Sequence, residues 1–131
     1  MDTTKKEQFE RVSSIMLNTF PELRDSYNEV MEVSGGRIPG LHIILGDVLN
    51  PFIRQHLYVM TEQKILEKVF AFVEDLVTNE DEYISNAGEV SVCEGIVFYG
   101  PEIYNKALLY ALPETKKSLQ KLNEYYNSSP T

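Results

Sequence analysis

The sequence predicts an all-α protein that folds as one compact bundle of six or seven helices. Apolar residues recur at the three- and four-residue spacing of a helix over most of the chain. At three points a proline followed by a glutamate stands where a helix should begin, at Pro21-Glu22, Pro101-Glu102 and Pro113-Glu114. A length of 131 residues suits one domain, so we expect a single helical domain over residues 1–131, with residues 1–4 and 127–131 frayed.

The first two helices are predicted over residues 4–19 and 21–33. Phe9, Val12 and Met16 share one face of the first helix, at helical spacing. The pair Gly35-Gly36 should end the second helix, because glycine accepts the left-handed conformation that often follows a helix C-terminus.

Residues 38–58 contain a turn and then a helix whose start has two alternatives. Residues 38–40, with proline and glycine in sequence, are typical of a turn. After it, either Asp47 caps the helix, or Asn50 caps the helix and Pro51 takes the first helical position. Both alternatives end the helix near Tyr58.

The clearest helix covers residues 62–77. Thr61 is placed to cap it, and Met60 and Ile65 are spaced to form a hydrophobic staple around that cap. Apolar residues cover more than half of its circumference, and a helix apolar over so wide an arc is usually a central one. We therefore expect this helix in the middle of the bundle.

Residues 83–99 allow two interpretations. The alternation of Val90-Ser91-Val92 and the β-branched and aromatic run after it are typical of strands, so the alternative is an α+β fold with a small hairpin at about residues 89–99. On a helix, Ala87, Ser91 and Gly95 would form a seam of small residues that lets another helix approach closely. We favour the helix because every neighbouring segment is predicted to be helical.

Two further helices, over residues 102–111 and 114–126, are predicted to close the chain. The last helix should turn its apolar residues toward the bundle, namely Leu119, Leu122 and Tyr126. All the connections are short, as is typical of a helix bundle.

The charge balance excludes several classes of partner. Twelve Lys and Arg stand against twenty Asp and Glu, which gives a net charge of −8. Phosphate backbones and anionic membrane surfaces attract basic proteins, so we expect no nucleic-acid partner and no membrane partner. The charged start of the chain does not resemble a signal peptide, and the most apolar stretch, residues 41–49, is too short to span a bilayer. We therefore expect a cytoplasmic protein.

No motif for catalysis, phosphate binding or calcium binding occurs in the sequence. His42 and His56 would lie about 21 Å apart even on one unbroken helix, too far to share a metal ion. Cys93, the only cysteine, has no Lys or Arg near it in sequence to lower its pKa. We expect no catalytic residue, no cofactor and no metal site, and we predict that the protein is not an enzyme.

The stretch of residues 69–105, called here the acidic stretch, contains no Lys or Arg. It holds eight carboxylates, which account for the whole net charge, and three tyrosines that we expect to be exposed: Tyr83, Tyr99 and Tyr104. Charge concentrated in this way steers a cationic partner toward the surface. The alternative is a solvated surface that only aids solubility. As protein-binding residues we single out Glu80, Asp81, Glu82, Tyr83 and Glu89.

The order of several short motifs resembles a family of small, acidic, mostly helical bacterial proteins of unknown function. The motifs are Phe20-Pro21-Glu22-Leu23, Gly46-Asp47, the helix around residues 70–76 with Glu74, Val90-Ser91-Val92-Cys93-Glu94 and Leu112-Pro113-Glu114-Thr115. Members of this type are often suspected to be immunity proteins encoded beside secreted toxins. The resemblance spans about residues 20–122, implies a helix over residues 83–99 and implies no catalytic residues.

These observations lead to two hypotheses of different class. The first is a cytoplasmic protein-binding module, an immunity-type inhibitor that occludes a basic protein such as a toxin nuclease through its acidic surface. The second is a structural or adaptor protein that self-associates, for instance as a homodimer, through an apolar helix face with Phe98, Tyr99 and Tyr104.

Overall fold

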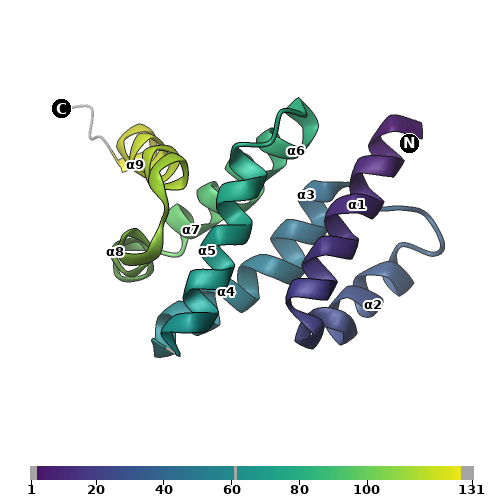
Figure 1. The fold of residues 1–131 in the computed structure, drawn as a ribbon, viewed down its shortest axis with the longest axis horizontal. Helices are drawn as coiled ribbons and strands as arrows, with labels where there is room; N and C mark the ends of the chain where they lie inside the picture. Colours follow the sequence, from purple (N-terminus) through teal and green to yellow (C-terminus); the bar gives the residue numbers. More distant parts are fainter. Residues whose placement is uncertain (1–2, 61, 128–131) are drawn as a thin grey trace.

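The computed structural model describes residues 3–60 and 62–127, and this part of the chain contains helices and turns but no strand (Figure 1). The elements are α1 (Thr3–Thr19), the 3-10 turn η1 (Pro21–Leu23), α2 (Arg24–Val33), α3 (Leu41–Ile44), the π segment η2 (Leu45–Leu49), α4 (Asn50–Val59), α5 (Gln63–Val77), α6 (Glu82–Ala87), the π segment η3 (Gly88–Cys93), α7 (Glu94–Phe98), α8 (Pro101–Tyr110) and α9 (Pro113–Asn127). The all-α prediction is confirmed. The prediction that residues 1–4 and 127–131 fray is wrong for residues 3, 4 and 127, which belong to α1 and α9. Residues 1–2 and 128–131, and Thr61, expected to cap α5, lie outside the described residues.

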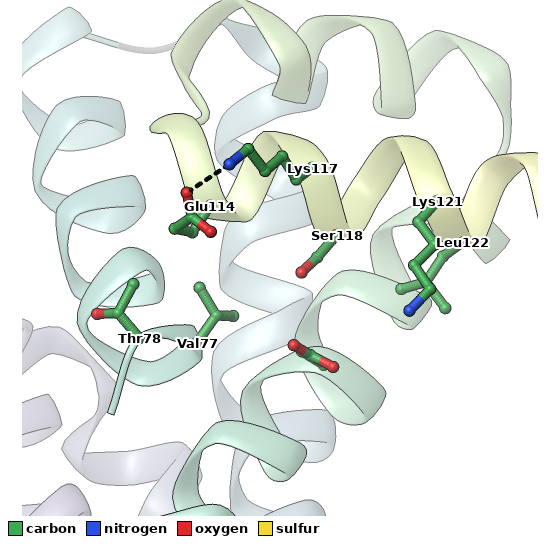
Figure 2. Close-up of a pocket in the computed structure, with 8 residues that line it drawn as sticks. Val77, Thr78, Glu114, Lys117, Ser118, Lys121 and Leu122 are labelled. Atoms are coloured by element: carbon green, nitrogen blue, oxygen red, sulfur yellow. Dashed lines mark ion pairs between the residues drawn. The ribbon is translucent and has the colours of Figure 1, made fainter. Parts of the chain in front are cut away.

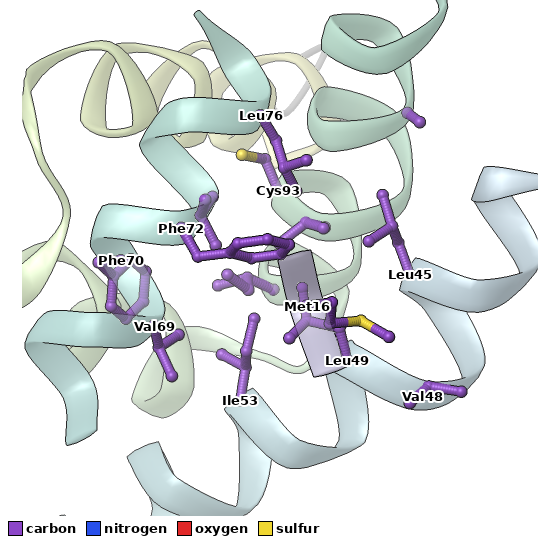
Figure 3. Close-up of a cluster of buried hydrophobic side chains, with 14 of the residues drawn as sticks. Met16, Leu45, Val48, Leu49, Ile53, Val69, Phe70, Phe72, Leu76 and Cys93 are labelled. Carbon is purple, nitrogen blue, oxygen red and sulfur yellow. The ribbon is translucent and has the colours of Figure 1, made fainter. Parts of the chain in front are cut away.

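Helix α5 lies in the middle of the bundle, as its wide apolar arc predicts (Figure 1). It packs against α4, α6, η3, α8 and α9. Its inward residues meet those of α1 and of the 41–59 helix in one core, drawn in Figure 3. Within that core the rings of Phe20 and Phe72 lie 5.9 Å apart and nearly perpendicular, a favourable arrangement for two aromatic rings.

Three helical elements begin at a proline, and α2 ends before a pair of glycines, as the sequence predicts. Pro21, Pro101 and Pro113 are the first residues of η1, α8 and α9. Gly35 and Gly36 follow the end of α2 with φ angles of 61° and 86°, in the left-handed region that glycine enters without strain.

The prediction for residues 41–58 is wrong at the start of the helix. Neither Asp47 nor Asn50 begins it, because α3, η2 and α4 run on without a break from Leu41 to Val59. The N–H of Asn50 donates to the carbonyl of Leu45, five residues back, so the backbone is wider there than in an α-helix. Proline crowds the carbonyl four residues before it in an α-helix. For Pro51 that carbonyl lies in the π segment, which explains how proline sits inside a continuous helix.

The helical interpretation of residues 83–99 is confirmed. Elements α6, η3 and α7 form one helix from Glu82 to Phe98, and η3 packs against η2. The predicted small-residue seam lies at this contact: Asn50 Nδ2 donates to the carbonyl of Ser91 at 2.5 Å, and a Cβ on Gly95 would overlap the Asn50 amide. A side chain at position 95 would therefore displace the Asn50 amide that links the two helices.

Candidate functional site

The carboxylates of the acidic stretch do not form one uniform surface. They are distributed over α5, α6, η3, α7, α8 and the α5–α6 turn, at Glu74, Asp75, Glu80, Asp81, Glu82, Glu89, Glu94 and Glu102. Their surroundings divide them into groups that hold helices together and groups that are exposed, and we describe them in that order.

Glu74 joins α5 to the start of α9. Its Oε1 accepts hydrogen bonds from the N–H and the hydroxyl of Thr115, each at 2.8 Å, and its Oε2 accepts from the N–H of Glu114 at 3.1 Å. Burial alone would raise the pKa of Glu74, but these hydrogen bonds and the charge of Lys117 outweigh it and lower the pKa below its ordinary value. Glu74 therefore caps α9 as a carboxylate, by a tertiary contact.

Asp81 fixes the turn between α5 and α6. Its Oδ1 accepts from the N–H of Ile84 at 3.0 Å, which caps α6, and its Oδ2 accepts from Gln8 Nε2 of α1 at 2.8 Å. The neighbouring Tyr83 is also engaged, because its hydroxyl accepts from the N–H of Leu41 at 2.9 Å. Of the five residues singled out from the sequence, Asp81 and Tyr83 thus support the fold.

Glu80, Glu82 and Glu89, the other three, are exposed. Glu80 and Glu82 flank Asp81, so they form an acidic corner at the start of α6. Glu89 lies further along the same helix, on η3, where it lines a pocket of about 430 Å³ together with Lys117 and Lys121 of α9 (Figure 2). It also lines a second pocket with Glu82. The structure therefore brings Glu80, Asp81, Glu82 and Tyr83 together and places Glu89 beside basic residues.

Basic side chains lie beside three carboxylates of the acidic stretch, Glu82, Glu89 and Glu102. Lys106 pairs with Glu102 at 3.3 Å, and Lys117 pairs with Glu114 at 3.1 Å on the rim of the Glu89 pocket. Lys5 of α1 lines a second pocket with Glu82 and Glu89. The acidic corner, where Glu80, Asp81 and Glu82 follow one another, thus has Lys5 beside Glu82.

The expectation of three exposed tyrosines in this stretch is wrong for Tyr104, which is buried. Tyr99 is half-buried, and the guanidinium of Arg54 lies 5.0 Å from its ring centre. Helical periodicity alone does not show which neighbouring helix covers a tyrosine, and here α8 and α9 pack against each other and against α7.

A family model for a domain of unknown function, DUF7674, matches residues 13–127. The chain belongs to the DUF7674 family. The match runs from within α1 to the end of α9, so the family domain includes all the helices except the first part of α1. No curated protein and no solved structure matches the chain. None of the helices described here is long and apolar enough to cross a membrane.

The chemical groups of this DUF7674 domain that most resemble catalytic residues are held in structural positions. Cys93 is buried, and burial, helped by the charges of Glu89 and Glu74, raises its pKa to about 12. The ring of His42 makes a hydrogen bond of 2.9 Å with the hydroxyl of Ser91. Among residues 3–60 and 62–127, no three His, Cys, Asp or Glu side chains are grouped so that they could hold a metal ion.

Sequence reasoning missed two features that the structure makes prominent. The first is the polar contact of Asn50 with the seam, which depends on two π segments that no local pattern predicts. The second is Tyr126, expected to face the bundle but 42 % exposed, where its ring meets the exposed ring of Phe98 at 4.8 Å. The sequence did contain a sign that a tyrosine is exposed here. Tyr125 and Tyr126 are adjacent, and two successive helical positions cannot both face inward.

Proposed function

We propose that this DUF7674 protein is a protein-binding module that binds a basic protein through the acidic corner, as an immunity-type inhibitor would inside the cell. The observation that carries the proposal is the anchoring of the corner by Asp81. Because Asp81 bonds to both α6 and α1, Glu80 and Glu82 are held outward on a fixed turn. A fixed charged surface loses little conformational freedom on binding.

The mechanism is electrostatic and steric. A basic enzyme such as a nuclease attracts phosphates, and carboxylates on a rigid turn present similar negative charge to the same surface. Charge of this kind mainly accelerates association, and salt weakens its effect because the Debye length is about 8 Å at physiological ionic strength. Occupation of the basic surface by the helical domain would then exclude the substrate.

The experiment combines affinity capture with charge reversal. The wild-type chain is used to capture partners from its own host at low salt, and the retained protein is eluted as the salt concentration rises. The association rate of the purified partner is then measured for the wild type and for a Glu80→Lys/Glu82→Lys variant. Asp81 is kept in this variant because it supports the fold.

We expect a basic partner whose association rate falls about tenfold or more in the variant at low salt. A matched control reverses two exposed glutamates of α2, by Glu29→Lys and Glu32→Lys, and changes the net charge equally. Equal rates for the wild type and the corner variant, or equal losses in both variants, would contradict the proposal.

Self-association through an apolar helix face is a second candidate function. Phe98, one of the three residues proposed for it, is 61 % exposed, whereas Tyr104 is buried. Sedimentation at several concentrations tests it. A stable dimer that is insensitive to salt and is lost in Phe98→Ala would support this function in place of the first.

A further inference from the structure

A cluster of exposed aromatic rings lies where α7 meets the end of α9. Phe98, Tyr125 and Tyr126 are 61 %, 75 % and 42 % exposed. The rings of Phe98 and Tyr126 lie 4.8 Å apart and those of Tyr125 and Tyr126 4.9 Å apart, both edge to face. Exposed tyrosines held rigid by neighbouring rings are typical of the anchor residues of binding interfaces. The cluster is separate from the acidic corner, because α8 and α9 lie on the side of α5 away from α1 (Figure 1).

Two rings of the cluster, but not that of Tyr125, line a groove of about 580 Å³. Phe98 and Tyr126 line it together with Pro101, and the side chains of Asn105 and Asn123 line it as well. Apolar walls with a few amide groups suit an extended peptide, since amides can bond to its backbone while the walls take its side chains.

Two carboxylates act on the hydroxyl groups of tyrosines that line the groove. Partial burial and the carboxylate of Glu94, which is hydrogen bonded to the hydroxyl, raise the pKa of Tyr126. Burial and the charge of Glu124 raise the pKa of Tyr104, which also lines the groove. The groove itself is lined by uncharged residues, so these two carboxylates and the net charge of −8 favour a cation over an anion there.

Other aromatic rings of the described residues already have a cation of the chain over them. These pairs are Lys5 with Tyr83, Arg54 with Tyr99, Lys68 with Phe20 and Lys106 with Tyr58, at 5.0–5.9 Å from nitrogen or guanidinium carbon to ring centre. Within residues 3–60 and 62–127 no cation of the chain lies over Phe98, Tyr125 or Tyr126. Lys121 lines a separate pocket with Tyr125 and Tyr126 and does not line the groove. Phe98 and Tyr126 are exposed, so a cation of a partner can reach them.

We propose that this groove binds an extended segment of a partner protein in which an arginine neighbours an apolar side chain. The arginine stacks on Phe98 and Tyr126 beside the carboxylate of Glu94, and the apolar side chain enters the groove. A second copy of the chain fits this surface less well, because each copy carries a net charge of −8. The proposal goes beyond the acidic corner and does not depend on it.

The test is a titration of the full isotope-labelled chain, followed by amide NMR. The probe is a blocked pentapeptide that alternates arginine with leucine and phenylalanine, and its counterpart has glutamate in place of each arginine. We expect saturable shifts at Asn105 and Asn123 with the arginine peptide only. Tyr126→Ala and Phe98→Ala should each weaken binding about tenfold. Both positions are exposed, and thermal unfolding checks that the variants remain folded.

The matched control is Leu109→Ala, which removes a side chain on α8 that is 72 % exposed and does not line the groove. It should bind the arginine peptide as the wild type does, and so should Glu80→Lys/Glu82→Lys, whose corner lies elsewhere. Loss of binding in that corner variant would show unspecific charge attraction and overturn the proposal, whereas loss of the basic partner at the corner alone would leave the groove intact.

Three further outcomes would overturn the proposal. The first is the absence of saturation, and the second is equal binding of the glutamate peptide. The third is occupation of the groove by the chain itself. Shifts that depend on protein concentration without peptide would identify a second copy as the occupant, and tenfold tighter peptide binding by a chain ending at Asn127 would identify residues 128–131.

Discussion

The helix of residues 82–98 has two regions that look alike in the sequence and differ in the structure. Its first turn, at Asp81 and Glu82, lies on the exposed acidic corner, whereas its π segment η3 is packed against the 41–59 helix. Both regions carry polar residues, but only the second has the spacing of small residues that predicts contact with another helix. In the first turn the polar groups cap a helix and face solvent; in the π segment the backbone carbonyl of Ser91 accepts a hydrogen bond from the buried Asn50.

The difference shows that the neighbouring helix, and not the polar character of a residue, decides whether that residue is buried or exposed. At the π contact Asn50 is buried, and its amide lies beside Gly95 and donates to the Ser91 carbonyl. At the corner the approaching helix is α1, which reaches Asp81 through Gln8 and leaves Glu82 exposed. The predictions below test this difference, from the largest expected loss of stability to the smallest.

The largest loss is expected for Gly95→Ala. The added Cβ would overlap the Asn50 amide, and overpacking of this kind costs about 3 kcal/mol of unfolding free energy when it also strains a hydrogen bond. Urea unfolding measures the loss. The matched control is Gly46→Ala in the other π segment, where the new Cβ meets no atom within 4 Å. The control should be neutral or up to about 1 kcal/mol stabilising.

A double variant isolates the contact. Asn50→Ala removes the amide that the new methyl group would meet, so Asn50→Ala with Gly95→Ala should be more stable than the sum of the two single losses predicts. Coupling of at least about 0.5 kcal/mol would confirm the contact. If the losses of unfolding free energy in the two single variants were additive, the side chains at positions 50 and 95 would not be in contact.

This contact also shows how far the fold could be predicted from the sequence. Pro21, Pro101 and Pro113 begin helices because the conformational limits of proline are local, and α5 lies centrally because its apolar arc is local as well. The prediction that a helix starts at Pro51 was wrong because a π turn before Pro51 lets the helix continue through it. That turn is paired with a second π turn in another helix, and a pairing over this distance leaves no local pattern.

The next largest loss is expected for Glu74→Gln, which weakens the cap of α9. Three hydrogen bonds to the carboxylate are affected, so the variant should lose about 2 kcal/mol at neutral pH. Asp75→Asn, at the exposed neighbouring position, is the control and should change the unfolding free energy by less than about 0.5 kcal/mol.

The pH dependence gives this prediction a sign. The pKa of Glu74 is lower in the folded protein than its ordinary value of 4.5, so its contribution is fully present above pH 4.5. The contribution is lost as the pH falls through the lowered pKa, because both states are then protonated. Thermal unfolding between neutral and acidic pH should show a smaller acid-induced loss for Glu74→Gln than for the wild type. Parallel curves would refute the capping role.

A smaller loss is expected for Asp81→Ala. Removal of a helix N-cap costs about 1 kcal/mol, and here the bond from Gln8 is lost as well. Glu80→Ala changes the adjacent exposed carboxylate and should leave the unfolding free energy within about 0.5 kcal/mol of the wild type. If the two variants were equally stable, Asp81 would not anchor the corner.

The candidate site could be predicted from the sequence only in part. The run from Glu80 to Tyr83 is contiguous, so its members had to lie near one another. Nothing in the spacing of charges shows that Asp81 bonds to α1 or that Glu89 faces Lys121, because those partners come from distant helices. The exposed rings of Phe98 and Tyr126 come together by the same kind of long-range packing.

The smallest effect on stability is expected for a thiol introduced into the first turn, Glu82→Cys, which provides a kinetic comparison with Cys93. The exposed thiol should react with an aromatic disulfide reagent at pH 8 within minutes. Cys93 is buried, and its pKa of about 12 leaves almost no thiolate at that pH. One thiol per chain should therefore react quickly in the variant and none in the wild type. In urea, where the helix is unfolded, the wild-type thiol should react as fast as the introduced one. A fast reaction of Cys93 in the native protein would show that the π segment opens readily, and the contrast between the two regions of this helix would then lie in their average structure and not in their stability.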